Sequence, residues 1–129
     1  MKSSTLLLAL CCTLVPAFLP AQVTDSTALW PNGTELDFGF FEARGVERFD
    51  SLVLQNITDE PFIIENIRSS CGCTAVDWPR EPLEPGAIIR IPVAFRCIKS
   101  GYVEKHLDVY LSHLEKRERI YVIADCPAR

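Results

Sequence analysis

The chain is poor in the residues and motifs from which most active sites are built. Its two histidines, His106 and His113, lie seven residues apart, and we expect both on the surface. There is no Gly-x-Ser-x-Gly nucleophile elbow and no glycine-rich phosphate loop. The carboxylates are scattered over expected turns and polar strand faces. We therefore expect a protein that is not an enzyme and has no resident cofactor.

The chain also lacks a basic excess and a long apolar run. With 13 Lys and Arg against 17 Asp and Glu, its formal net charge is −4, which opposes binding to nucleic acids or anionic membranes. The apolar run from Leu6 to Leu19 is shorter than the roughly 20 residues that span a bilayer. Because Lys2 precedes this run, we interpret residues 1–21 as a signal peptide cut after Ala21. The sequence predicts an exported protein, periplasmic or extracellular, without a transmembrane segment.

The part that follows the signal peptide has the size of one domain. Residues 22–33 are mostly polar without sustained periodicity, and we expect a flexible spacer there. Residues 34–126 suffice for a single domain with its own core. In an exported domain, cysteines are expected to form disulfide bonds. Four cysteines remain in this part of the chain, namely Cys71, Cys73, Cys97 and Cys126.

Short apolar stretches, separated by Gly, Pro, Asn and Asp, recur from Thr34 onward. Within them large apolar residues occupy alternate positions, most clearly from Ile89 to Phe95, and this period of two is typical of β-strands. No helix of three turns is predicted. The pattern favours an all-β, immunoglobulin-like sandwich of seven strands. The expected strands are residues 35–41, 48–56, 62–69, 74–78, 88–97, 103–111 and 119–125.

Strand parity predicts one disulfide bond. Cys97 shares a strand face with Phe95, and Cys126 shares one with Ala124, so both thiols should point inward. In a seven-stranded sandwich the fifth strand ends at the pole to which the seventh strand returns. We therefore expect a bond between Cys97 and Cys126, and its loop of about 30 residues predicts roughly 3 to 4 kcal/mol of stabilisation.

The segment Cys71-Gly72-Cys73 follows the third strand at the same pole and allows several interpretations. The two cysteines could close a small, strained and easily reduced ring. As thiolates they could bind a soft metal, and two of them suit copper(I) better than zinc, which prefers four ligands. Either could also pair with Cys97 or Cys126. Structural bridging, thiol redox exchange and copper(I) binding all stay open.

The order of the motifs resembles a bacterial family named "domain of unknown function 1573". The resemblance covers about residues 34–125, and Ser-Cys-Gly-Cys-Thr is its most specific segment. The residues that carry it are Leu36-Asp37-Phe38-Gly39, Leu52, Leu54, Asn56, Ser70-Cys71-Gly72-Cys73-Thr74, Pro85-Gly86, Val93, Phe95 and Ser100-Gly101-Tyr102.

The resemblance implies an exported bacterial protein with a fold akin to the pilus-chaperone and sperm-protein type sandwiches, and it implies no activity. By this likeness Asp37 and Gly39 belong to the first strand and Asn56 to the turn after the second. The signature loop would contain Ser70, Cys71, Gly72, Cys73 and Thr74. The family usually has no cysteine where Cys97 and Cys126 stand, and their joint presence here supports pairing with each other.

Two functional hypotheses follow. The first is a non-enzymatic module that presents sheet faces or an edge strand to another protein or to an envelope component. The second is a thiol redox or copper(I)-binding protein that uses Cys71 and Cys73. The sequence does not identify the partner.

Overall fold

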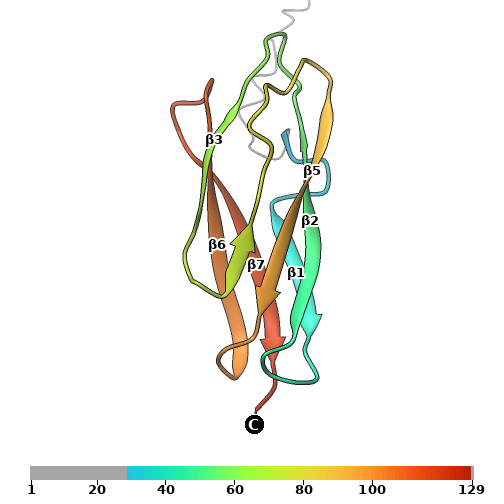
Figure 1. Cartoon of the computed structure of the whole chain (residues 1–129), viewed down its shortest axis with the longest axis vertical. Helices are drawn as coiled ribbons and strands as arrows, with labels where there is room; N and C mark the ends of the chain where they lie inside the picture. Colours follow the sequence, from blue (N-terminus) through green and yellow to red (C-terminus); the bar gives the residue numbers. More distant parts are fainter. Residues whose placement is uncertain (1–28, 129) are drawn as a thin grey trace, which may run out of the picture.

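Seven strands form the described part of this chain, residues 29–128 of a computed structural model, and no α-helix occurs in that range (Figure 1). The all-β prediction is confirmed, and every strand end lies within two residues of its predicted position. The strands are β1 (Glu35–Phe40), β2 (Glu47–Gln55), β3 (Ile64–Ser69), β4 (Thr74–Val76), β5 (Ile88–Arg96), β6 (Gly101–Leu111) and β7 (Glu118–Cys126).

The strands form two facing sheets. One sheet has the order β1-β7-β6-β3 and the other the order β2-β5-β4. β1 runs parallel to β7, and every other pair is antiparallel. The chain passes from one sheet to the other at four connections, β1–β2, β2–β3, β3–β4 and β5–β6, and the β3–β4 connection lies at one side of the sandwich (Figure 1). The predicted immunoglobulin-like sandwich is confirmed.

The core lies between the sheets and follows the period-two pattern of the sequence. Ile91, Val93 and Phe95 of β5 are buried, as are Leu107 and Val109 of β6. Side chains of this kind each contribute roughly 1.5 to 3 kcal/mol through removal from water. Alternation therefore fixes which face of each strand points inward, and with it the pairing register.

The packed domain begins earlier than the sequence predicts. Leu29 and Trp30 fall in the expected spacer, residues 22–33, yet they are 7% and 1% exposed and belong to the core cluster. An isolated apolar pair has no periodicity, and only its burial against the sheets shows that it is part of the domain. The packed domain therefore includes Leu29 and Trp30. The predicted signal peptide and residues 22–28 lie outside the described residues.

Asp37 and Gly39 make an irregularity in β1. The Asp37 Oδ1 atom accepts a hydrogen bond from the Gly39 N–H at 2.7 Å, and the Gly39 φ is +68°. The register of β1 against β7 shifts between Asp37 and Phe40. Such a bulge needs a residue that tolerates positive φ, which explains the glycine. The first-strand placement that the resemblance implied is confirmed.

Asn56 is a buried anchor at the end of β2. Its Nδ2 donates to the carbonyl oxygens of Glu60 and Leu83, both at 2.8 Å, and its Oδ1 accepts from the N–H and hydroxyl of Thr58. Its side chain is fully buried. Because each polar atom of this buried side chain has a hydrogen-bond partner, Asn56 stabilises the fold. It joins its own turn to the β4–β5 connection.

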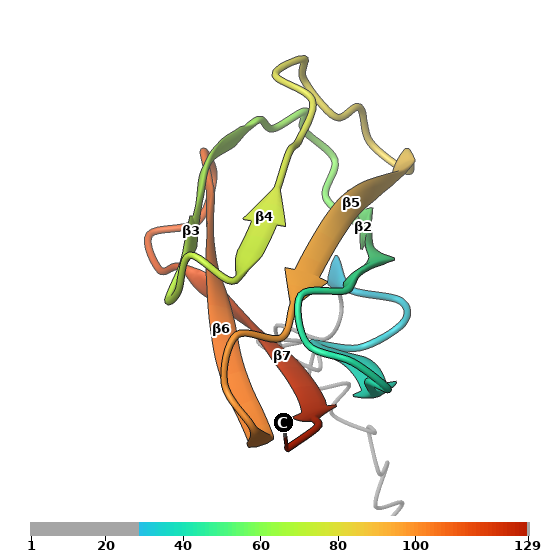
Figure 2. The same cartoon turned by 60° about the horizontal axis from the view of Figure 1, so that its bottom comes forward.

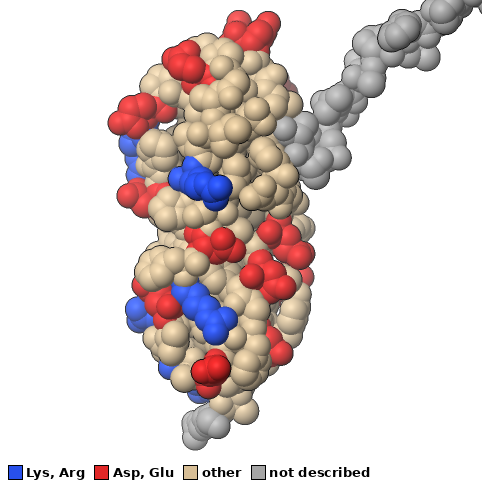
Figure 3. Space-filling view, turned by 90° about the vertical axis from the view of Figure 1, so that its right-hand side faces the viewer, with Lys and Arg blue, Asp and Glu red and all other residues tan. Residues whose placement is uncertain are grey.

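Charges of both signs are distributed over the surface. On the face turned toward the viewer in Figure 3, acidic and basic side chains are interspersed, and no continuous basic patch occurs there. Within residues 29–128, no helix is long and apolar enough to cross a membrane.

Candidate functional site

The candidate site is built around the β3–β4 connection, where a short loop carries the chain from one sheet to the other. Ser70 extends the pairing with β6 by one residue, because its N–H donates to the His106 carbonyl at 2.9 Å. The Ser70 hydroxyl then accepts the His106 N–H, also at 2.9 Å. A side-chain oxygen thus takes the place of the next backbone acceptor, and the chain is released from the sheet at Cys71.

The loop carries a disulfide bond between Cys71 and Cys73, with 5.3 Å between their Cα atoms. Cys73 is 6% exposed, whereas Cys71 is half-buried. The Cys71 Sγ accepts the Cys73 N–H at 3.3 Å and lies 3.7 Å from the Thr74 hydroxyl. Two donors therefore face the sulfur of the more exposed cysteine.

Gly72 stands at the exposed tip of this bridge. Its φ lies outside the left-handed region, and a Cβ added there would meet no atom within 4 Å. The fold explains neither a conformational nor a steric need for glycine at this position.

The second disulfide bond joins Cys97 and Cys126, as strand parity predicted. Their Cα atoms lie 5.7 Å apart, and the two residues are 1% and 2% exposed. Cys97 follows β5 directly, next to Arg96, whose N–H donates to the Cys73 carbonyl at 2.9 Å. Both bonds therefore lie toward the same end of the sandwich, as expected, but their sulfurs belong to separate pairs.

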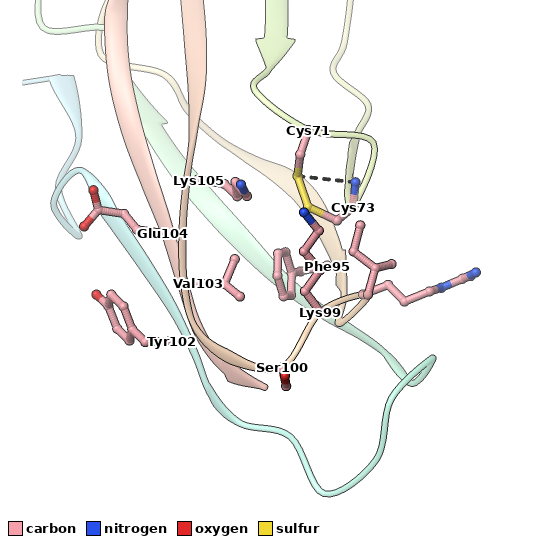
Figure 4. Close-up of a pocket in the computed structure, with 11 residues that line it drawn as sticks. Cys71, Cys73, Phe95, Lys99, Ser100, Tyr102, Val103, Glu104 and Lys105 are labelled. Atoms are coloured by element: carbon pink, nitrogen blue, oxygen red, sulfur yellow. Dashed lines mark hydrogen bonds between the residues drawn. A yellow bond between two sulfur atoms is a disulfide. The ribbon is translucent and has the colours of Figure 1, made fainter. Parts of the chain in front are cut away.

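A pocket of about 360 Å³ opens beside the Cys71–Cys73 bond. Phe95 of β5 lines it together with Val103 of β6. Figure 4 shows Lys99 extending from the β5–β6 loop and Lys105 extending from β6, on the side of the pocket that holds the bridge. Neither lysine forms a salt bridge within residues 29–128. The pocket is therefore cationic in a protein whose net charge is negative.

The other charged groups near the pocket do not neutralise Lys99 and Lys105. Arg96 lines the pocket too, but its guanidinium pairs with Glu47 at 3.1 Å. Glu104 borders the pocket as well, but its carboxylate points away from the Cys71–Cys73 bond (Figure 4). Lys99 and Lys105 are thus the cations available to an anionic group that enters.

The pocket adjoins an unpaired stretch of β6. β6 pairs with β7 from Gly101 to Val109. On its other side the strand pairing with β3 reaches only as far as Leu107, opposite Ser69. Residues 101–105 therefore have no strand beside them on that side, and we call this stretch the open edge (Figure 2).

Some backbone N–H and carbonyl groups of the open edge point toward the side where β3 is missing. His106 exchanges hydrogen bonds with Ser70, so its N–H and carbonyl point toward the β3 side. Because successive residues of a strand alternate in direction, the same groups of Tyr102 and Glu104 also point to that side, where no strand accepts or donates. The side chains of Val103 and Lys105 point to the side of the Cys71–Cys73 bond, whereas those of Tyr102 and Glu104 point away from it (Figure 4).

An ionic cluster lies on the other half of β6. Asp108 accepts hydrogen bonds from Arg119 at 2.8 and 3.0 Å, and Arg117 lies 3.2 Å away. The hydrogen bond from Arg119 lowers the pKa of Asp108, with the charges of Arg119, Arg117 and His106 acting in the same direction against partial desolvation. We call the half of β6 that pairs with both β3 and β7 the closed half. The cluster stabilises this half, and none of its residues lines the pocket.

The structure brings some of the predicted site residues together and separates others. Cys71 and Cys73 meet at the pocket, whereas Asp37 and Asn56 serve the β1 bulge and the β2 anchor. Lys99 and Lys105 were not predicted as site residues. The sequence contains one signal for them, since Lys105 interrupts the apolar parity of β6.

Metal ligation finds little support beyond the cysteine pair. No group of three or more His, Cys, Asp or Glu side chains suited to a metal ion occurs within residues 29–128. Both sulfurs of the pair are engaged in their mutual bond. Copper(I) binding by Cys71 and Cys73 would need the reduced pair, and it stays a prediction.

The profile of the family described as "Protein of unknown function (DUF1573)" matches residues 31–126. The chain belongs to this family. The DUF1573 match includes the Cys71–Cys73 loop, the pocket and the open edge. No curated protein matches the chain.

Solved structures similar to this DUF1573 domain share its fold at low sequence identity. A protein of unknown function from Porphyromonas gingivalis has a TM-score of 0.63 and 15% identity over 71% of this chain. The ASH/PapD-like domain 7 of human CEP192 has a TM-score of 0.62 and 13% identity, covering 74% of this chain and 82% of that domain. The VesB protease of Vibrio cholerae has a TM-score of 0.53 and 13% identity, over 71% of this chain and 30% of that one.

These likenesses show the sandwich and nothing about activity. This chain spans 44% of the Porphyromonas gingivalis protein. Because the same architecture carries many unrelated functions, function has to be argued from the site.

Proposed function

We propose that this chain is an exported, non-enzymatic module that binds an extended segment of another protein, or of an envelope component, along the open edge of β6. The observation that carries the proposal is the mismatch in strand length at residues 101–105, where β6 continues and β3 does not. An extended segment added there would continue the line of β3 and supply the missing hydrogen bonds.

The pocket supports this choice of edge. Side chains of an added strand alternate between two faces, so every second one would point toward the pocket beside the Cys71–Cys73 bond. Lys99 and Lys105 favour an acidic side chain there. Tyr102, 67% exposed, offers an apolar ring to the outward-facing side chains. The favoured partner is an extended segment with an acidic residue among its inward positions.

The edge can be tested by removing one donor. Glu104→Pro deletes an N–H that points to the open side and leaves the pairing of β6 with β7 intact. The matched control, Glu104→Ala, removes the same carboxylate and keeps the N–H. We expect the wild-type protein and the Ala variant to retain one specific partner from native envelope extracts, with about a tenfold loss for the Pro variant.

Two results would remove the basis of this proposal. One is equal partner retention by the Pro and Ala variants, because the backbone donor would then be irrelevant. The other is a protein that stays monomeric without a partner and co-purifies with a stoichiometric metal.

Copper(I) binding by the reduced pair is the alternative that the sequence left open. Its support is the presence of two cysteines two residues apart, one of which, Cys71, is only half-buried. Competition between the reduced protein and a colorimetric copper(I) chelator measures it directly. The alternative predicts a one-to-one complex that the Cys71→Ser variant loses, and it is refuted if wild type and variant compete equally.

A further inference from the structure

We propose that the Cys71–Cys73 bond is a thiol-exchange site in which Cys71 is the sulfur attacked by an incoming thiolate. The proposal goes beyond the binding function and does not require the open edge, so either can fail without the other. It rests on three features of the bond: its unequal exposure, the small loop that it closes and the cations next to it.

The two cysteine residues differ in exposure. Exchange proceeds by attack of a thiolate on one sulfur, with the other sulfur leaving in line with the incoming one. Cys73 is 6% exposed, whereas the half-buried Cys71 is open to solvent. The approach from solvent therefore leads to the Cys71 Sγ, and Cys73 becomes the leaving group.

The surroundings of the bond stabilise the charges that exchange produces. Lys99 and Lys105 line the pocket into which the Cys73 thiolate would be released, and nearby cations stabilise thiolates. When Cys71 itself leaves in a second step, the Cys73 N–H and the Thr74 hydroxyl are placed to donate to its sulfur. Each sulfur thus has a source of stabilisation at the moment it becomes negative.

The reaction balances with a dithiol as the reductant. A first thiolate of the partner attacks the Cys71 Sγ, a bond forms between them, and the Cys71–Cys73 bond breaks with its electron pair on the Cys73 Sγ. A second partner thiolate then attacks the partner sulfur of the mixed disulfide and expels Cys71. The partner dithiol has become a disulfide, Cys71 and Cys73 have become thiols, and the two protons lost by the partner equal the two gained here.

The chemistry of the pocket indicates the class of partner. Lys99 and Lys105 attract thiols that carry negative charge, and a thiol within an acidic extended segment fits these cations. Glutathione, a tripeptide thiol with net negative charge, is a suitable probe. Cysteamine, a small thiol with a positive charge, is the matched control.

The first experiment compares the two disulfide bonds of the same molecule. The oxidised protein is equilibrated with glutathione buffers of increasing reducing strength, quenched in acid, alkylated and mapped by mass spectrometry. The quantity compared is the ratio of reduced glutathione to glutathione disulfide at which half of a bond is reduced. We expect this ratio to be about tenfold or more lower for Cys71–Cys73 than for Cys97–Cys126. Simultaneous opening, or earlier opening of Cys97–Cys126, would overturn the proposal.

The second experiment identifies the attacked sulfur. In wild-type protein quenched during the reaction, the mixed disulfide with glutathione should sit on Cys71. The single variants should agree, with the free thiol in Cys73→Ser reacting with glutathione disulfide about tenfold faster than the one in Cys71→Ser. Glutathione found mainly on Cys73 of the wild type would refute the assignment whether or not the variants fold.

The third experiment removes the cations. In the Lys99→Gln/Lys105→Gln variant we expect attack by glutathione to slow by about threefold to tenfold, with cysteamine unaffected or faster. Lys116→Gln, in the distant β6–β7 connection, should leave both rates unchanged. If the double variant and the Lys116 control react alike with glutathione, the two lysines play no part in the exchange.

Discussion

The two disulfide bonds of this domain share one end of a sandwich and differ in almost every property that governs reactivity. Cys97–Cys126 connects the ends of two long strands, and both residues are buried. Cys71–Cys73 spans a single glycine in a loop between the sheets, with one half-buried sulfur beside a cationic pocket. The first bond joins the two sheets within the core, whereas the second lies in a loop beside the open edge of β6.

The two bonds differ because β3 ends before β6 does: one bond is buried and supports stability, and the other is left partly exposed. β6 and β7 pair along most of their length, and the Cys97–Cys126 bond at the end of β7 is buried in the core. Where β3 ends before β6 does, both a backbone edge and a sulfur are left accessible. Stability should therefore depend on the buried bond and on buried polar anchors, and chemistry on the exposed bond.

The largest expected effect comes from removing the buried bond. The Cys97→Ala/Cys126→Ala variant should lose about 3 to 4 kcal/mol of unfolding free energy, because the bond closes a long loop in the unfolded chain. Urea denaturation without reductant measures this loss. A loss below about 1 kcal/mol would show that the bond is not the main covalent support of the fold.

Removing the Asn56 anchor tests the claim that stability resides away from the pocket. Asn56→Ala should cost about 2 to 3 kcal/mol, because it removes the hydrogen bonds of a fully buried side chain and leaves the Thr58 N–H without its acceptor. Denaturation curves at constant temperature give the value. The control Asn32→Ala, at an exposed position, should cost less than about 0.5 kcal/mol. If the two variants lost the same unfolding free energy, Asn56 would not be a stabilising anchor.

Removing the exposed bond should cost less and change more of the chemistry. The Cys71→Ser/Cys73→Ser variant should lose only about 1 to 2 kcal/mol, since so short a loop restrains the unfolded chain little. Circular dichroism should show an unchanged sheet content, and denaturation should give the loss. A cost as large as that of the buried bond would erase the contrast between the two.

The smallest expected effect concerns Asp108, on the closed half of β6. Its pKa is lowered in the folded protein chiefly by the hydrogen bond from Arg119, so its contribution is present above its unfolded pKa of about 4 and is lost as pH falls through the lower folded value. Asp108→Asn should cost about 0.5 to 1 kcal/mol at pH 7.

The pH dependence separates the ionic contribution from packing. The difference between wild type and Asp108→Asn should stay constant from neutral pH down to about pH 5 and shrink below about pH 4. The control Asp59→Asn, at an exposed carboxylate without a salt bridge in residues 29–128, should cost less than about 0.5 kcal/mol at pH 7. A difference that persists at low pH would assign the effect to packing.

The sequence predicts the sandwich and the buried bond well, because both follow from period-two alternation. Parity places Cys97 beside Phe95 and Cys126 beside Ala124, and topology then joins the two strand ends. The Cys71–Cys73 pairing was one of several alternatives, since local spacing permits a small ring without requiring it.

The pocket and the open edge could not be predicted in the same way. They depend on where β3 stops relative to β6, and this is decided by the Ser70 hydroxyl and its hydrogen bond with His106. Such a long-range pairing has no local signature in the sequence. Leu29 and Trp30 were missed for a related reason, because two apolar residues define no period.

The most direct test of the central claim is a tryptic map of the unreduced protein with free thiols blocked at lysis. Cleavage after Arg68 and Arg80 places Cys71 and Cys73 in one peptide, whereas cleavage after Arg96, Lys99 and Arg119 places Cys97 and Cys126 in two others. The account predicts a first peptide with an internal disulfide, linked to nothing else, and a covalent link between the other two. A link from the Cys71 and Cys73 peptide to either of the others would contradict it.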